Sequence, residues 1–160
     1  MVNTSSQLQS KILMKHMMCL QNSHIQEFMT GGWTCVYASG AASGATNTAN
    51  GLYAKATTSS GAYVHNWYTN NSISVDKFST LHARFITTKI PQAVRLGLHT
   101  NKTATANEAS GAMTYIYPTV TDAEVQIDLD LTDVTGTFYI KLNYQGGDSA
   151  EVLWTEVWAE

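Results

Sequence analysis

Charged side chains are scarce in this sequence. They make up 13% of its 160 residues, and the formal net charge is −3. This balance leaves no basic surface for nucleic acid or for an anionic membrane, so we expect neither partner. No segment approaches the roughly 20 apolar residues that span a bilayer. The apolar stretch of residues 12–20 contains Lys15 and His16 and lacks a small-residue cleavage site, which argues against a secretion signal.

Cysteine is equally scarce. Cys19 and Cys35 would allow one disulfide, but two cysteines form no framework pattern, and free thiols are expected. His16 and His24 lie near Cys19, yet only His16 and Cys19 have the spacing of one helical face. We predict no metal site there.

Familiar catalytic motifs are missing. The sequence has no Gly-x-Ser-x-Gly elbow, no His-Glu-x-x-His motif and no phosphate-binding glycine loop. His65, His82 and His99 recur at equal spacing, but the residues around them do not repeat, so a three-histidine metal site is not expected.

Carboxylates occur together on one predicted strand, where Glu124, Asp128 and Asp130 would share a face. Side chains placed in this way are more often solvated or calcium-binding than glycosidic. We therefore predict a protein that is not an enzyme and has no cofactor. Calcium in an acidic corner stays an open alternative.

Alternation of apolar and polar residues is the main pattern in the sequence. Val125, Ile127 and Leu129 alternate with polar residues, an acidic turn with Gly136 follows, and a second alternating run covers residues 137–144. Such segments are typical of antiparallel sheets with one buried face. Nine strands are predicted, at residues 33–37, 52–56, 62–68, 80–88, 93–100, 114–117, 123–129, 137–144 and 151–159. We expect one mainly β domain, a two-sheet antiparallel sandwich over residues 31–160.

Residues 4–29 predict a helix that begins with hydroxyl caps and ends at Gly31-Gly32, so residues 1–30 form an N-terminal element of their own. One stripe of this helix consists of Met14, Met17, Met18, Gln21, Ile25 and Phe28. The helix packs either on its own domain or on a partner helix in an oligomer.

The last predicted strand has apolar residues on both faces, which indicates burial by the helix or by a neighbouring subunit. Trp154 and Trp158 are expected on one face of it. The candidate oligomer interface is therefore Met14, Met18, Ile25, Phe28, Trp154 and Trp158.

Donor-bearing side chains gather in the middle of the chain. If residues 80–88 and 93–100 form a hairpin around residues 89–92, His82, Arg84, Arg95 and His99 lie on one surface. Tyr63, His65 and Trp67 share a face of the preceding strand, and Tyr115 and Tyr117 share a face of theirs. Aromatic rings with nearby donors suit sugars, although the same rings could simply fill the core. The candidate carbohydrate-binding residues are Tyr63, His65, Trp67, His82, Arg84, Arg95 and His99.

Residues 33–160 contain a Ser-x-Ser-Val-Asp corner, the run Asp-Leu-Thr-Asp-Val-Thr-Gly-Thr-Phe-Tyr-Ile and the closing Glu-Val-Leu-Trp-Thr-Glu-Val-Trp-Ala-Glu. This stretch resembles the jelly-roll domains, similar to carbohydrate-binding modules, of tail and minor structural proteins of phages and prophages of Gram-positive bacteria. The resemblance implies a β-jelly roll in a virion appendage, often trimeric, that supports or performs attachment to cell-surface glycans. It transfers no binding residue.

Two functional hypotheses follow. The first is a noncatalytic tail-associated module that binds a host cell-surface saccharide, is made in the bacterial cytoplasm, joins other virion tail proteins and forms a homo-oligomer, with a trimer favoured. The second is a purely structural assembly domain without a ligand.

Overall fold

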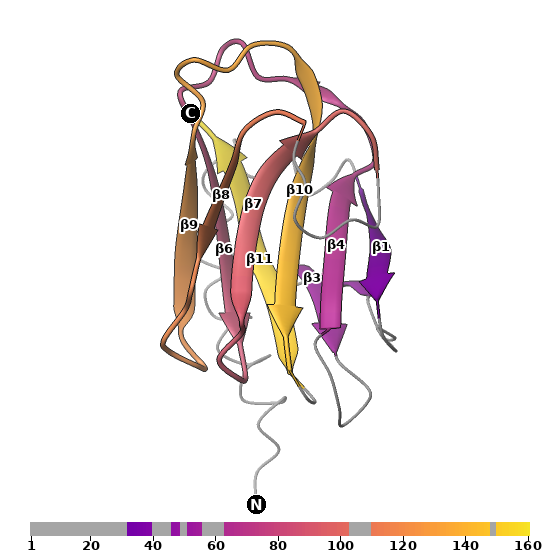
Figure 1. The fold of residues 1–160 in the computed structure, drawn as a ribbon, viewed down its shortest axis with the longest axis vertical. Coiled ribbons are helices and arrows are strands. Elements are labelled where there is room, and N and C mark those ends of the chain that lie inside the picture. The colour runs from indigo at the N-terminus through magenta and orange to yellow at the C-terminus, as the bar shows by residue number, and fades with distance from the viewer. Residues whose placement is uncertain (1–31, 40–45, 49–50, 56–62, 103–109, 148–149) are drawn as a thin grey trace, which may run out of the picture.

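The computed structural model describes residues 32–39, 46–48, 51–55, 63–102, 110–147 and 150–160 (Figure 1). The predicted N-terminal helix lies outside the described residues, and so do Met14, Met18, Ile25 and Phe28. Within the described part of the chain every regular element is a strand. The strands are β1 (Trp33–Ser39), β2 (Thr46–Thr48), β3 (Gly51–Lys55), β4 (Tyr63–Thr69), β5 (Ile73–Ser74), β6 (Thr80–Thr87), β7 (Ala93–His99), β8 (Met113–Ile116), β9 (Glu124–Asp130), β10 (Thr137–Gly146) and β11 (Glu151–Ala159).

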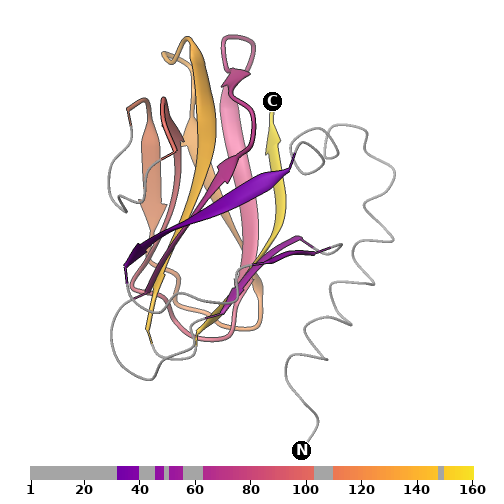
Figure 2. The same ribbon diagram turned by 90° about the vertical axis from the view of Figure 1, so that its right-hand side faces the viewer.

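The strands form two antiparallel sheets that stand as two layers (Figure 2). Sheet A has the order β1-β4-β10-β7-β8, with β5 paired to β10, and sheet B has the order β2-β3-β11-β6-β9. This confirms the predicted mainly β, two-sheet jelly-roll sandwich. All nine predicted strands are present, and the short strands β2 and β5 are additional. Across the described residues no helix is long and apolar enough to cross a membrane.

The core lies between the inner faces of the two sheets. Alternation puts Ile140, Leu142 and Tyr144 of β10 inside, opposite Phe85 of β6 and Trp154 of β11, all of them buried. The Tyr144 hydroxyl and the Thr87 hydroxyl are 2.8 Å apart, so a buried hydrogen bond also joins the two sheets. Apolar burial on this scale is the main stabilising term of the domain.

The predicted hairpin of residues 80–88 and 93–100 is wrong. β6 pairs with β9 and β11 in sheet B, whereas β7 pairs with β8 and β10 in sheet A. The segment between them therefore crosses from one sheet to the other. Alternation requires only that each strand bury its apolar side, and β6 and β7 do so by facing each other across the core.

The prediction that Trp154 and Trp158 share a face is also wrong. The register of β11 against β6 runs from Trp154 opposite Phe85 to Glu156 opposite Arg84, which leaves Thr155 as an extra bulge residue. Trp154 consequently points into the core and is 0% exposed, while Trp158 lies on the outer face opposite His82. Trp154 cannot belong to an oligomer interface in this fold.

Candidate functional site

The seven predicted carbohydrate-binding residues do not form one surface. His65 and Trp67 point from β4 into the core, and Tyr63 begins the same strand opposite Gly146. His82 and Arg84 lie on the outer face of sheet B, and Arg95 and His99 lie on the outer face of sheet A. The sequence placed these residues together because it predicted a hairpin of residues 80–88 and 93–100. In the structure these two strands belong to different sheets.

One outer surface combines polar donors with aromatic rings, and we call it the sheet A face. It is formed by the outward positions of the four strands β4, β10, β7 and β8. Its members are Asn66, Tyr68, Arg95, Gly97, His99, Met113, Tyr115, Tyr139, Lys141, Asn143 and Gln145. Asn66, Tyr68, Lys141 and Asn143 are at most 1% exposed, so they support the face from below and do not contact solvent. Arg95 and His99 are the predicted site residues that it contains.

Arg95 is at the centre of a hydrogen-bonded row across this face. Its Nη1 atom donates to Asn143 Oδ1 at 2.8 Å and to Gln145 Oε1 at 3.2 Å. Asn143 Nδ2 donates to Asn66 Oδ1 at 2.8 Å, and Gln145 Nε2 donates to Gln92 Oε1 at 3.0 Å. The row joins side chains of three strands (β4, β7 and β10) and of the β6–β7 loop into one array of amide and guanidinium groups.

Two tyrosines at the β8 edge of the face are open to solvent. Tyr115 is 56% exposed and Tyr117 is 66% exposed, and their rings meet edge to face with centroids 5.5 Å apart. Exposed Ile90 and Val120 lie in the β6–β7 and β8–β9 loops, which a hydrogen bond from Asp122 N to Thr87 O joins at the same end of the sandwich (Figure 1). Large rings held in the open are an unusual surface feature, since most are buried.

Two lysines of this region lie against aromatic rings. Lys102 Nζ is 5.0 Å from the centre of the Tyr139 ring, and Lys141 Nζ is 5.8 Å from the centre of the Tyr68 ring. Lys141 is only 1% exposed. The Tyr68 hydroxyl is buried and has no hydrogen-bond partner in the structure as described, so a polar donor and acceptor stays unsatisfied beneath this surface.

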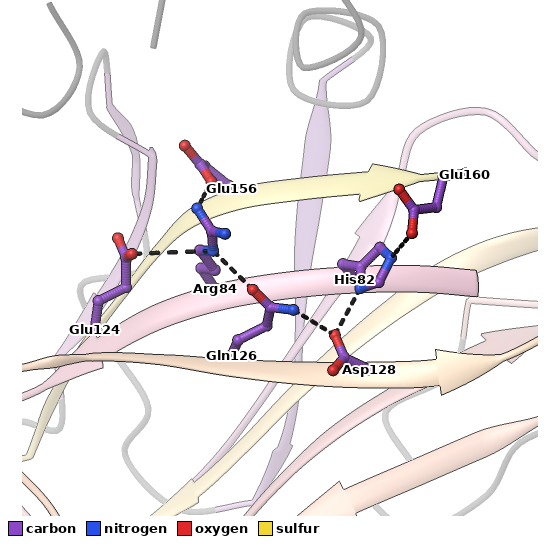
Figure 3. Close-up of polar contacts among 7 residues, drawn as sticks. All are labelled: His82, Arg84, Glu124, Gln126, Asp128, Glu156 and Glu160. Atoms are coloured by element: carbon purple, nitrogen blue, oxygen red, sulfur yellow. Dashed lines mark hydrogen bonds and ion pairs between the residues drawn. The ribbon is translucent and has the colours of Figure 1, made fainter. Parts of the chain in front are cut away.

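The outer face of sheet B carries a different network, in which charges are paired (Figure 3). Arg84 Nη1 donates to Glu156 Oε2 at 2.8 Å, and Arg84 Nε donates to Gln126 Oε1 at 3.0 Å. His82 Nδ1 is 2.6 Å from Asp128 Oδ1. The Nε2 atom of His82 lies 3.4 Å from Glu160 Oε1 without the geometry of a hydrogen bond.

Trp158 covers part of this network. Its ring stacks on His82 with centroids 4.7 Å apart, and the Arg84 guanidinium lies 4.7 Å from the ring centre. Burial opposes ionisation of Asp128, but hydrogen bonds from His82 and Gln126 and the charges of His82 and Arg84 outweigh it and lower the pKa of Asp128. Apart from His82 Nε2, which has no hydrogen-bond partner, the side chains of this network bind one another, which indicates a structural role for this face.

The described residues contain no group of three or more His, Cys, Asp or Glu arranged to hold a metal ion. The acidic corners bind their own chain instead. Asp76 Oδ1 accepts from the Gly136 amide at 2.6 Å, and Asp130 Oδ1 accepts from the Thr132 hydroxyl at 2.6 Å. Each carboxylate therefore already serves as a turn or strand-end cap.

Cys35 is a free thiol in β1. Burial, partly offset by a backbone hydrogen bond from Asn66, raises its pKa to about 12. A thiol with that pKa is almost wholly protonated at neutral pH, so Cys35 is not equipped as a nucleophile. Cys19 lies outside the described residues.

The sequence reasoning missed Tyr68, Lys141, Asn143 and Gln145 as parts of a site. Alternation did place Tyr139, Lys141 and Asn143 on a polar face of their strand. It could not show that β4 and β7 are the neighbours of β10, and this pairing is what gathers the side chains.

No family model matches the sequence, and no curated protein matches it significantly. Solved structures do match. TmCBM61, solved with β-1,4-galactotriose, is 9% identical, with a TM-score of 0.53 over 83% of this chain and 92% of that one. The low-affinity xylan-binding module CBM86 from Roseburia intestinalis is 15% identical, with a TM-score of 0.48 over 81% and 96%. The family 11 module from Clostridium thermocellum is 11% identical, with a TM-score of 0.42 over 79% and 82%.

The similarity to TmCBM61 shows a shared fold alone. The chain is a mainly β sandwich of the kind found in carbohydrate-binding modules.

Proposed function

We propose that this chain is a noncatalytic module that binds a saccharide on the sheet A face. The observation that carries the proposal is the exposed Tyr115–Tyr117 pair beside the Arg95–Asn143–Gln145 row. Sugar rings offer C–H faces that stack on aromatic rings, and their hydroxyls need hydrogen-bond partners at fixed positions. The sheet A face presents both features together, because Arg95 and Gln145 are partly exposed and the buried Asn143 holds Arg95 in position.

The fold supports the same proposal. TmCBM61, which has this sandwich fold, was solved with a bound β-1,4-linked galactotriose. The proposal adds a position for binding in this chain, on β7, β8 and β10. It needs no catalytic residue, because stacking and hydrogen bonding suffice for recognition.

The virion setting is a finer proposal, and it is supported by the sequence resemblance of residues 33–160. In that setting the saccharide is a host cell-surface glycan, and the chain joins other tail proteins as a homo-oligomer, with a trimer favoured. The alternative of a purely structural domain loses one of its supports, since Trp154 is in the core. The contribution of residues 1–30 to an oligomer stays a prediction under either hypothesis.

Affinity gel electrophoresis tests the binding proposal. The probes are β-1,4-xylan, β-1,4-galactan, polygalacturonate and purified Gram-positive cell-wall glycan. We expect at least one to retard the wild-type chain, and Tyr115→Ala to weaken that retardation about tenfold because a stacking platform is lost.

The matched control is Trp158→Ala, which removes an aromatic ring from the opposite outer face and is expected to leave retardation unchanged. Thermal unfolding of both variants shows whether they remain folded. Retardation that survives Tyr115→Ala but disappears in Trp158→Ala would place the site on sheet B and refute the proposal.

A further inference from the structure

Charge is divided between the two sheets. The strands of sheet A contain no Asp or Glu, while those of sheet B contain Glu124, Asp128, Asp130, Glu151 and Glu156. The chain as a whole has a net charge of −3, so the acid-free sheet is a local departure from the overall balance. A site that selects ligands by charge needs a local electrostatic field that differs from that of the whole chain.

The cations of the two sheets also differ in their partners. On sheet B, Arg84 is 2.8 Å from Glu156, and Lys55 is 2.9 Å from Glu151. On sheet A, Arg95 donates to the amide oxygens of Asn143 and Gln145. Sheet A thus holds its guanidinium with neutral acceptors, which position the group without cancelling its charge.

Lys102, at the other end of β7, is likewise held by neutral partners. Its Nζ atom donates to the backbone oxygen of Asn70 at 2.8 Å and lies over the Tyr139 ring. Tyr139 is paired with His99 at the end of β7, about 13 Å along the strand from Arg95 at the usual rise per residue. The face therefore carries two accessible cations whose separation suits an oligosaccharide of several residues.

Lys141 lies between these two, paired with Gly97 across β10 and β7. It is 1% exposed, so it takes no direct part in binding a ligand. An ammonium group so far from water needs partners within the fold, and Lys141 lies near the Tyr68 ring.

We propose that the ligand of this site is an acidic saccharide, one whose carboxylate, sulfate or phosphate groups bind Arg95 and Lys102 while one of its rings stacks on Tyr115. This inference rests on the proposed saccharide site and specifies its ligand class. Guanidinium groups bind planar anions through paired hydrogen bonds, and burial against a neutral surface strengthens such bonds. The negative net charge of the chain disfavours unspecific binding of polyanions, so recognition has to come from this face.

Matched pairs of polysaccharides test the inference. The first pair is polygalacturonate and its carboxyl-reduced form, and the second is dextran sulfate and dextran. We expect the chain to bind the acidic member of at least one pair about tenfold or more tightly than the neutral member, with binding that weakens as salt is raised. Which pair shows the preference separates carboxylate from sulfate recognition.

Lys102→Gln is expected to lower affinity for the acidic member about tenfold, the effect of one lost charge-assisted hydrogen bond, and to leave the neutral member unaffected. Arg95→Gln is expected to lower affinity for the acidic member by at least the same factor, and for the neutral member by a smaller one, because Arg95 also belongs to the row that binds sugar hydroxyls. Arg84→Gln is the control, because Arg84 is a strand arginine of the opposite face. Lys102 is exposed, so its variant keeps the test sound if Arg95→Gln fails to fold.

Three results would overturn the inference. Equal binding of both members of each pair, unchanged in Lys102→Gln, would refute the acidic ligand and leave the saccharide site standing. Loss of acidic binding in Arg84→Gln alone would move the charge recognition to sheet B. Binding of none of these four polysaccharides, nor of the xylan, galactan and cell-wall probes, would refute the proposed function as well.

Discussion

At the scale of single residues, His65 shows how burial in the core lowers the pKa of a histidine. It is 1% exposed on the inner side of β4, and burial lowers its pKa to about 4 from an ordinary value of about 6.5. The folded protein thus holds His65 neutral at pH values where the unfolded chain binds a proton. The folded state is therefore penalised as the pH falls.

We predict that stability contributed by neutral His65 is complete above about pH 6.5 and is lost as the pH falls towards 4. The loss reaches roughly 3 kcal/mol near pH 4, from the size of the pKa difference. Urea unfolding between pH 4 and 8 measures it, and His65→Gln should flatten the curve over this window.

Asp76 provides a control for the pH interval in which His65 acts. Hydrogen bonds from the Gly136 amide and the Ser74 hydroxyl lower the pKa of Asp76, so its contribution is lost only at more acidic pH, below about 4. Asp76→Asn should consequently leave the slope between pH 4 and 6.5 intact. An unaltered slope in His65→Gln would show that another group causes it.

At the scale of elements, the bulge in β11 decides which side chains face outward. A regular strand would have kept Trp154 and Trp158 on one face, as the sequence pattern predicted. With Thr155 as the extra residue, Glu156 comes to lie opposite Arg84 and Trp158 opposite His82, where both join the outer network of sheet B.

Deleting Thr155 should therefore be tolerated. Trp154 and Glu156 would become neighbours in a regular strand, with the first still inward and the second still outward, so we expect a cost of about 1–2 kcal/mol. Deleting Val157 instead would turn Trp158 inward and should cost about 4 kcal/mol or more. Thermal unfolding of both deletions measures the difference, and equal damage would contradict this account of the bulge.

The same scale shows what the sequence could predict. Periodicity located all nine longer strands, because each has to bury one side and expose the other. It could not predict which strands pair, since β6 and β7 satisfy their patterns equally well side by side or across the core. The bulge at Thr155 was invisible for a similar reason, because no glycine or proline accompanies it.

At the scale of the whole molecule, strand pairing decides which predicted residues can act together. Arg95 and His99 came from sequence reasoning, but Lys141, Asn143 and Gln145 join them only because β10 lies next to β7. Arg84 and His82 were separated from them for the same reason and belong to the hydrogen-bonded network of sheet B. The two outer faces consequently differ in chemistry: the strands of sheet A contain aromatic residues and no Asp or Glu, whereas those of sheet B contain acidic residues, of which Glu156 is paired with Arg84.

Mapping the ligand by NMR tests the central claim most directly, namely that the sheet A face binds saccharide. A chain labelled with ¹⁵N is titrated with oligosaccharides from xylan, galactan and polygalacturonate, and backbone amide shifts are followed. We predict saturable shifts that cluster on β7, β8 and β10 around Arg95, Tyr115 and Asn143. Shifts that cluster on β6, β9 and β11, or no saturable shift with any of the three, would contradict the account.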